Sequence, residues 1–189
     1  MSNLITQIGG KFSKYSPGLF DLKARLIQAG IKVVYPTGNS IVKTINGIDL
    51  SFDPMQTPLS FYEVECEYLR SIRSSSFHTV YNIYQNNIGY VGRSAGMEIG
   101  YAMVHQIPIV FLHEPSFQRS IAPDINILLN ERISKFNVLR LDSISELDLV
   151  KRLEEISKLR VDYELSVESE ISIMAYVQVI LNEYRTQCI

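Results

Sequence analysis

The run Ile107-Pro108-Ile109-Val110-Phe111-Leu112 constrains the fold of this 189-residue chain more than any other segment. An apolar run without polar alternation has no face to turn toward water, so the strand it forms has to be covered on both sides. Strands of this kind are typical of parallel sheets that carry helices on both faces. The run is far too short to cross a bilayer, so we expect no membrane segment and no membrane partner.

Strands and helices are predicted to alternate on either side of this run. Apolar runs that end at glycine, proline or polar residues predict strands over 4–8, 31–35, 77–81, 107–112 and 137–141. Apolar residues at helical spacing predict helices over 19–27, 60–73, 94–105, 124–136, 143–159 and 163–185. This order predicts an α/β fold, a doubly wound flavodoxin-like or Rossmann-like sheet of about five parallel strands flanked by helices.

Three segments carry more local expectations. Residues 41–43 and 48–52, joined through Asn46-Gly47, form either a small hairpin or a flexible flap. Ser143-Ile144-Ser145-Glu146 matches a capping box that would begin the following helix. Without repeats or a linker, residues 1–189 are expected to be one domain, with 160–189 as a C-terminal helical extension. The apolar face of that extension packs either on another subunit or on its own domain.

Composition excludes several functions. The formal net charge is −2 and no long basic stretch exists, so a nucleic acid polymer is not an expected partner. Cys66 and Cys188 lie far apart, which fits a reducing compartment, and no basic region precedes an apolar run at the start of the chain. We therefore expect a cytoplasmic protein. His105 and His113 form no ligand set with carboxylates, so we expect no metal, and nothing indicates another cofactor.

The most unusual chemistry follows the third predicted strand, where a doubly wound sheet binds its ligands. Gly89 and Gly92 let the backbone approach a ligand closely. Ser94 stands near a helix start, where free backbone N–H groups favour an anion. Glu98 lies one turn further on the same face. A carboxylate would then sit just below a place suited to a phosphate or a hydroxyl.

The residues alone leave a plainer interpretation of Glu98 open. A glutamate on the first turns of a helix is usually a solvated or capping residue. Gly96 and Gly100 argue for something more, because each costs a helix interior about 1 kcal/mol relative to alanine. Close packing against the neighbouring strand would also explain these glycines.

At this point the sequence resembles the nucleoside 2-deoxyribosyltransferase-like superfamily, which includes 2′-deoxynucleoside 5′-phosphate N-hydrolases. The strongest match is Asn82 followed by the glycine loop and glutamate helix of 89–102 and by Ile107-Pro108-Ile109. The opening Gly9-Gly10-Lys11-Phe12 and the segment 65–72 are similar to two further parts of that family. Together these matches cover about the first 115 residues.

The resemblance implies a mechanism and a site. Glu98 would attack the anomeric carbon of a (deoxy)nucleoside or nucleoside 5′-monophosphate and displace the base, leaving a covalent glycosyl intermediate that water or a second base resolves with retention. A homo-oligomer, a dimer or higher, is expected because related enzymes complete their pockets with a neighbour's residues. The residues carried over as binding the substrate are Gly9, Gly10, Phe12, Asn82, Gly89, Tyr90, Gly92, Arg93 and Ser94.

The chain also departs from the family's pattern. A base-contacting aspartate near the start of the third strand is missing, and the nearest positions are Ser76, Phe77 and His78. The tyrosine that transferases carry on the first strand corresponds to Thr6. These departures favour hydrolysis over base exchange, and they motivate an alternative, a non-catalytic nucleotide-binding module with a degenerate glycosidase pocket.

Two further interpretations explain less of the sequence. A flavodoxin-like phosphate-binding regulator would account for the glycine loop but gives Glu98 no role. A phosphoribohydrolase of the lysine-decarboxylase-like group would carry a Pro-Gly-Gly-x-Gly-Thr signature, which this sequence lacks.

Overall fold

The fold is taken from a computed structural model of the chain. It describes residues 3–11, 18–40, 42–45, 48–50, 59–116, 126, 130–131, 133–139, 144–159 and 161–186. Some sequence predictions lie outside these residues, namely the placement of Phe12, of Ser143, of Cys188 and of most of the helix expected over 124–136.

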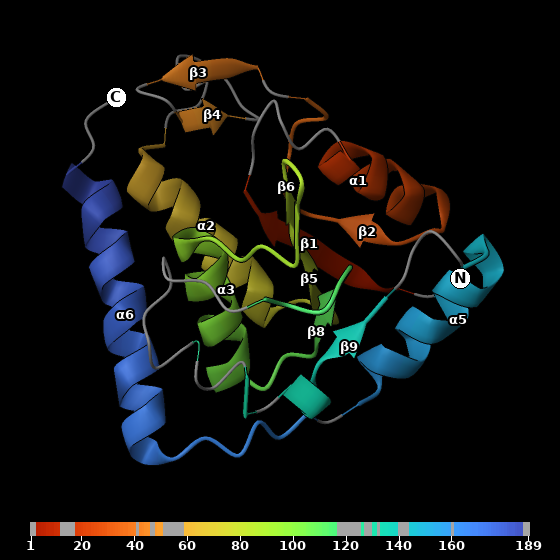
Figure 1. The fold of residues 1–189 in the computed structure, drawn as a ribbon. Helices are drawn as coiled ribbons and strands as arrows, with labels where there is room; N and C mark the ends of the chain where they lie inside the picture. The colour runs from red at the N-terminus through yellow and green to blue at the C-terminus, as the bar shows by residue number, and fades with distance from the viewer. Residues whose placement is uncertain are drawn as a thin grey trace.

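A five-stranded parallel sheet forms the centre of the molecule, as the sequence predicts (Figure 1). Its strands follow the order β2-β1-β5-β8-β9. Their bounds are β1 Ile5–Gly10, β2 Lys32–Val33, β5 Phe77–Tyr81, β8 Ile109–Phe111 and β9 Asn137–Val138. The order is that of a flavodoxin-like doubly wound sheet, whose switch point lies between β1 and β5. A ligand crevice is expected beyond the carboxyl ends of these two strands.

Several strands are shorter than the apolar runs that predict them, although the pairing goes further than the strand bounds. Next to β2, the Val34 amide donates to Thr6 and the Ile8 amide donates to the carbonyl of Tyr35. Next to β8, the Leu112 amide donates to the carbonyl of Val80. The predictions for these strands differ from the structure only at their ends, where twist weakens the regular pattern.

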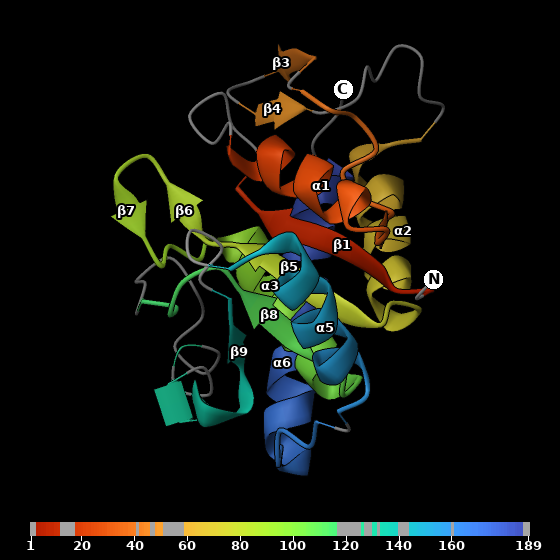
Figure 2. The ribbon, with the colours of Figure 1, turned by 90° about the vertical axis from the view of Figure 1, so that its right-hand side faces the viewer.

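Helices cover both faces of the sheet (Figures 1 and 2). The helices α1 Gly18–Gln28 and α5 Glu146–Ser157 lie on one face, and α2 Phe61–Arg73 and α3 Arg93–Val104 lie on the other. Each face has its own apolar core. The α1/α5 core contains Ile8, Leu22 and Leu153, and the α2/α3 core contains Leu69, Val80 and Ile99.

Local sequence signals account for the bounds of these helices. Ser60 caps α2 through a complete capping box with Glu63. Gly30, at a φ of +79°, follows the end of α1, a conformation that glycine adopts without strain. The cap predicted at Ser143 for α5 is wrong, because the helix begins after Ser145, whose hydroxyl accepts from the Asp148 amide. Ser145 and Asp148 have the same spacing as the box that the sequence offered two residues earlier.

Two small hairpins lie outside the main sheet. β3 Lys43–Ile45 pairs antiparallel with β4 Ile48–Leu50, which confirms a hairpin over this segment. β6 Ile83–Tyr84 pairs with β7 Asn87–Ile88 directly after β5, and the sequence did not predict it. Its strands of two residues are too short to show an alternating pattern.

The C-terminal helix α6 Val167–Thr186 packs on its own domain, along the outer side of α2 and α3 (Figure 1). Ile173, Val177, Ile180 and Leu181 are buried in the α2/α3 core. Within the extension expected over 160–189, α6 therefore packs on the α2/α3 face of its own chain. None of the described helices is long and apolar enough to span a membrane.

Candidate active site

Glu98 and Gly9 meet at the carboxyl end of the two central strands. Gly9 is the next-to-last residue of β1, and Glu98 stands on the second turn of α3. A Cβ atom placed on Gly9 would lie 2.0 Å from Oε2 of Glu98 and 2.9 Å from Cε1 of His78. Only glycine leaves the space that the carboxylate occupies. The structure thus brings together the first glycine turn and the glutamate helix that the sequence singled out.

His78 lies beside the same carboxylate. Its Nε2 atom is 3.9 Å from Oε2 of Glu98, which is within reach of an ion pair but too long for a hydrogen bond. The two side chains are 0% and 5% exposed. The pair is therefore removed from bulk water.

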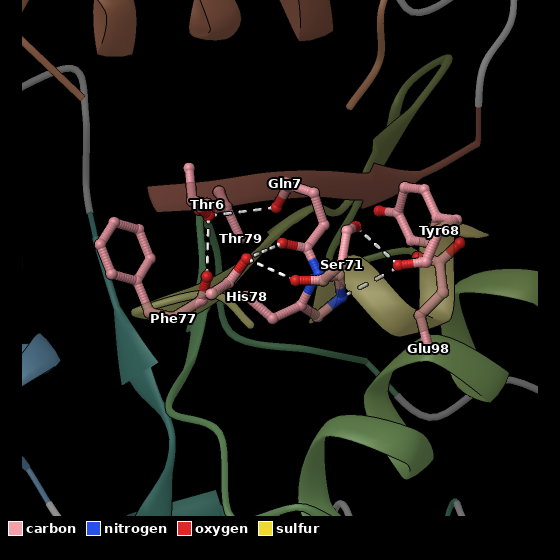
Figure 3. A network of polar contacts seen from close by, with 9 residues as sticks. Thr6, Gln7, Tyr68, Ser71, Phe77, His78, Thr79 and Glu98 are labelled. Carbon is pink, nitrogen blue, oxygen red and sulfur yellow. Dashed lines mark hydrogen bonds and ion pairs between the residues drawn. The ribbon is translucent and has the colours of Figure 1, made fainter. Parts of the chain in front are cut away.

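More polar groups surround this pair without partners (Figure 3). Within the part of the chain that the structure describes, six buried side-chain atoms lack a hydrogen bond. They are Nε2 of Gln7, Oε2 of Glu65, the hydroxyl of Tyr68, both ring nitrogens of His78 and Oε2 of Glu98. Native proteins rarely leave buried polar atoms unpaired, so a group of them in one place is typical of a site that receives a ligand or ordered water.

Burial sets the ionisation of this cluster. It raises the pKa of Glu98 well above its ordinary value, and the nearby charge of Glu65 adds to the effect. Burial also raises the pKa of Glu65 to about 7 and lowers the pKa of His78 to about 3. The residue Glu65 is only half-buried, but its Oε2 atom is out of contact with solvent, which explains the raised value. At neutral pH the free protein therefore holds His78 in its neutral form, and burial shifts Glu98 toward its protonated form.

The start of α3 is tied to the C-terminal helix. The guanidinium of Arg93 forms an exposed ion pair with Glu183, with 2.7 Å between Nη2 and Oε1. The hydroxyl of Ser94 shares a 2.7 Å hydrogen bond with the hydroxyl of Tyr184. Both side chains predicted to hold a phosphate thus have partners on α6, and their contact with substrate stays a prediction.

Two glycines of the predicted site have structural neighbours. Gly89 has a φ of +85°, and a Cβ there would lie 2.6 Å from the carbonyl oxygen of Glu114. Gly92 caps α3 with its backbone alone, and a Cβ there would meet the ring of Tyr90 at 3.2 Å. Close backbone packing accounts for Gly89, and the ring of Tyr90, which packs on Tyr84, covers Gly92.

The remaining predicted residues lie around this edge. Asn82 is fully buried, and its amide donates to the carbonyl of His113 and accepts from the His113 amide. It therefore joins the segment after β5 to the segment after β8. Gly10 has a φ of +143° and faces the carbonyl of Tyr81.

Thr6 does not take the place of the family's tyrosine next to the glutamate. Its hydroxyl donates to the carbonyl of Phe77 at 2.9 Å, and it lies 2.9 Å from the hydroxyl of Thr79 on the α1/α5 side. Because side chains alternate along a strand, Gln7 and Gly9 share the opposite face. Gln7 is therefore the β1 side chain that lies on the face of Glu98.

Sequence reasoning missed four members of the site: Gln7, Glu65, Tyr68 and Tyr184. Glu65 and Tyr68 stand three residues apart on α2, a spacing that puts them on one face, and this was the available signal. The raised pKa of Tyr184 has burial as its main cause, with the charges of Glu65 and Glu98 contributing. No sequence pattern indicates that α6 returns to this place.

A groove of about 1170 Å³ lies elsewhere, at the carboxyl ends of β8 and β9 beside α5. Its walls include His113, Glu114, Asp148 and Arg152, and it shares no lining residue with the surroundings of Glu98. Among the described residues, no three His, Cys, Asp or Glu side chains gather where they could hold a metal ion.

Comparison of the chain with family models, with curated proteins and with solved structures finds no match. The geometry around Glu98 is therefore the basis for a functional proposal.

Proposed function

We propose that the protein cleaves or transfers at the N-glycosidic bond of a (deoxy)nucleoside or nucleoside 5′-monophosphate through a covalent glycosyl intermediate on Glu98. The observation that carries the proposal is the position of one carboxylate, buried against Gly9 at the carboxyl end of β1. This is the place at which a doubly wound sheet binds its ligands. The resemblance of residues 82–109 to the deoxyribosyltransferase-like superfamily supplies the reaction class.

The chemistry requires a carboxylate in a site that excludes water. Glu98 attacks the anomeric carbon, and the electron pair of the C–N bond leaves with the base. Water or a second base then displaces the carboxylate from the same carbon with net retention. Burial suits the glycosyl ester, because the ester would hydrolyse prematurely in open solvent.

The unpaired polar groups support a sugar-sized ligand. Gln7 and Tyr68 each offer a hydrogen-bond donor, and Glu65 offers an acceptor, on two elements that pack next to α3. A pentose carries hydroxyl groups that donate and accept at once, so it satisfies such a mixed set. Assembly into a homo-oligomer and a cytoplasmic location belong to the same proposal.

The test of this function is base release from a panel of nucleosides and nucleoside 5′-monophosphates. Glu98→Gln keeps the shape of the side chain and removes the nucleophile, so the rate is expected to fall at least about a thousandfold. Glu155→Gln, an exposed position on α5, is the matched control and should leave the rate unchanged. Acid quenching followed by peptide mass spectrometry should find the sugar on the peptide that contains Glu98. Undiminished base release by Glu98→Gln would rule out this mechanism.

A second candidate is a nucleotide-binding module without turnover. Arg93 and Ser94 are engaged by Glu183 and Tyr184, and Glu98 is only 3% exposed, which leaves the carboxylate little access to a reacting substrate. Thermal stabilisation by a nucleotide in the absence of any base release would support this candidate. Turnover by the wild-type protein excludes it.

A further inference from the structure

The proposed reaction requires Glu98 in its ionised, carboxylate form. A protonated carboxyl group is a poor nucleophile, and burial raises the pKa of Glu98 and so favours its protonated form. Catalysis by this residue therefore requires a group that accepts the proton inside the site. The acceptor has to lie within hydrogen-bond reach after a small movement.

We propose that His78 is a second catalytic residue, which shares one proton with Glu98, takes it from the carboxyl group when the substrate binds and gives it to the leaving base. The inference rests on the proposed function of Glu98. It stands on the 3.9 Å separation of Nε2 and Oε2 and on the absence of any hydrogen-bond partner for either ring nitrogen among the described residues.

The alternative acceptors around Glu98 are less suitable. Glu65 and Tyr68 face it from α2, and Tyr184 faces it from α6. Glu65 and the tyrosines accept a proton only as anions, a form that burial disfavours by raising their pKa, and transfer to one of them would leave the site with a net negative charge. Gln7, on β1, does not titrate. An imidazole accepts a proton and becomes a cation beside the new carboxylate, so the charge of the pair stays at zero.

The proton balance of the cycle then closes. In the resting pair, Glu98 carries the proton and His78 is neutral. Transfer to Nε2 leaves a carboxylate, which bonds to the anomeric carbon as the C–N bond breaks. The base leaves with the electron pair and takes the proton from the imidazolium, which has lost its counter-ion. In the second half, water bonds to the anomeric carbon while the bond between that carbon and Glu98 breaks, and its electron pair stays on the carboxylate. The proton that the water loses returns to the pair of Glu98 and His78.

This cycle predicts an unusual pH profile. The active pair holds one proton, so the wild-type rate should fall on the alkaline side, where that proton is lost. In His78→Gln the active form is the bare carboxylate, and the rate should instead rise with pH as Glu98 ionises. If His78 only filled space, its replacement would change the magnitude of the rate without reversing the dependence of the rate on pH.

The experiment measures kcat and KM for base release at several pH values for wild type, His78→Gln and Glu65→Gln. We expect His78→Gln to lower kcat about a hundredfold near neutral pH, in the range usual for acid–base groups, with KM changed by less than threefold. Glu65→Gln should keep the falling alkaline limb, because Glu65 is not part of the shared pair. A falling limb in His78→Gln as well would overturn the inference while leaving Glu98 as the nucleophile.

A second measurement does not need turnover. The imidazole ¹⁵N resonances of His78 in the free protein should shift when the pair loses its proton at alkaline pH. In Glu98→Gln the same resonances should stay constant over that range. Constant resonances in both proteins would contradict a shared proton. A shift in wild type without base release from any nucleoside would support the pair and reject the proposed function.

Discussion

The two faces of the central strands treat buried polar groups in opposite ways. On the α1/α5 face, the hydroxyls of Thr6 and Thr79 bond to each other, and Thr6 also reaches the carbonyl of Phe77 (Figure 3). On the α2/α3 face, at the same level of the sheet, Gln7, His78 and Glu98 keep atoms without partners. The first arrangement stabilises the fold, whereas the second costs stability and is typical of a site that receives a ligand or ordered water.

The difference teaches where to look for function in a doubly wound sheet. The polar side chains on both faces are buried, so burial alone does not distinguish the two faces. What distinguishes them is whether a polar residue finds its partner within the fold. This contrast is measurable in the free energy of unfolding.

The largest effect is expected from acid. Burial lowers the pKa of His78 to about 3 from an ordinary 6.5, so its contribution to stability is present above pH 6.5 and is lost as the pH falls toward 3. The full loss amounts to as much as about 5 kcal/mol, because each pKa unit corresponds to about 1.4 kcal/mol. His78→Gln lacks this dependence. The difference in unfolding free energy between the two proteins, from urea titrations between pH 7 and 3.5, should therefore change by several kcal/mol.

The raised pKa values of Glu98 and Glu65 have the opposite effect on the free energy of unfolding. A buried carboxyl group with a raised pKa makes the protein less stable as the pH increases. Both proteins keep these two carboxyl groups, so their own contributions largely cancel in the comparison. A constant difference between the two titrations would show that His78 is not buried in its neutral form.

The next effect concerns the space between β1 and α3. Gly9→Ala places a methyl group where Oε2 of Glu98 lies, and overpacking of this kind should cost about 1–3 kcal/mol. Base release should also fall, because the carboxylate has to move away from its position. Melting temperature and base-release rate are the measurements.

The control for Gly9→Ala is the double variant with Glu98→Ala. Removing the carboxylate should recover much of the lost stability, with the contact to Cε1 of His78 remaining. Additive effects of the two substitutions would mean that Gly9 does not serve Glu98.

The sequence predicted the fold well because the fold depends on repeated local patterns. Alternating strands and helices, the capping residue Ser60 and the continuous apolar run before His113 each act within a few residues. The sequence also pointed to Gly9 and Glu98. It placed a phosphate or hydroxyl near Ser94 from the start of a helix, and the family resemblance added Arg93, but it could not show that Glu183 and Tyr184 lie opposite them.

Long-range packing explains what the sequence missed. The sequence places His78 only near the position of a missing base-contacting aspartate, because nothing near it in the chain reveals that Glu98 lies across from it. Thr6 was compared with a tyrosine beside the nucleophile, although strand alternation places it on the other face. Which residue faces the site depends on the register of β1 against β5, and a single sequence does not determine that register.

The smallest effect is expected on the α1/α5 face, where the buried hydroxyl groups have hydrogen-bond partners. Thr6→Val keeps the shape of the side chain and leaves the hydroxyl of Thr79 without its partner, so it should cost about 1 kcal/mol. The double variant with Thr79→Val removes both polar groups and should be nearly as stable as the wild type. On the other face, Glu98→Met removes a carboxyl oxygen that has no partner to leave behind, so it should raise the unfolding free energy while abolishing base release. Urea titrations of these variants at one pH measure the contrast directly. If Glu98→Met lost stability as Thr6→Val does, the carboxyl group would be held by the fold, and the two faces would not differ in kind.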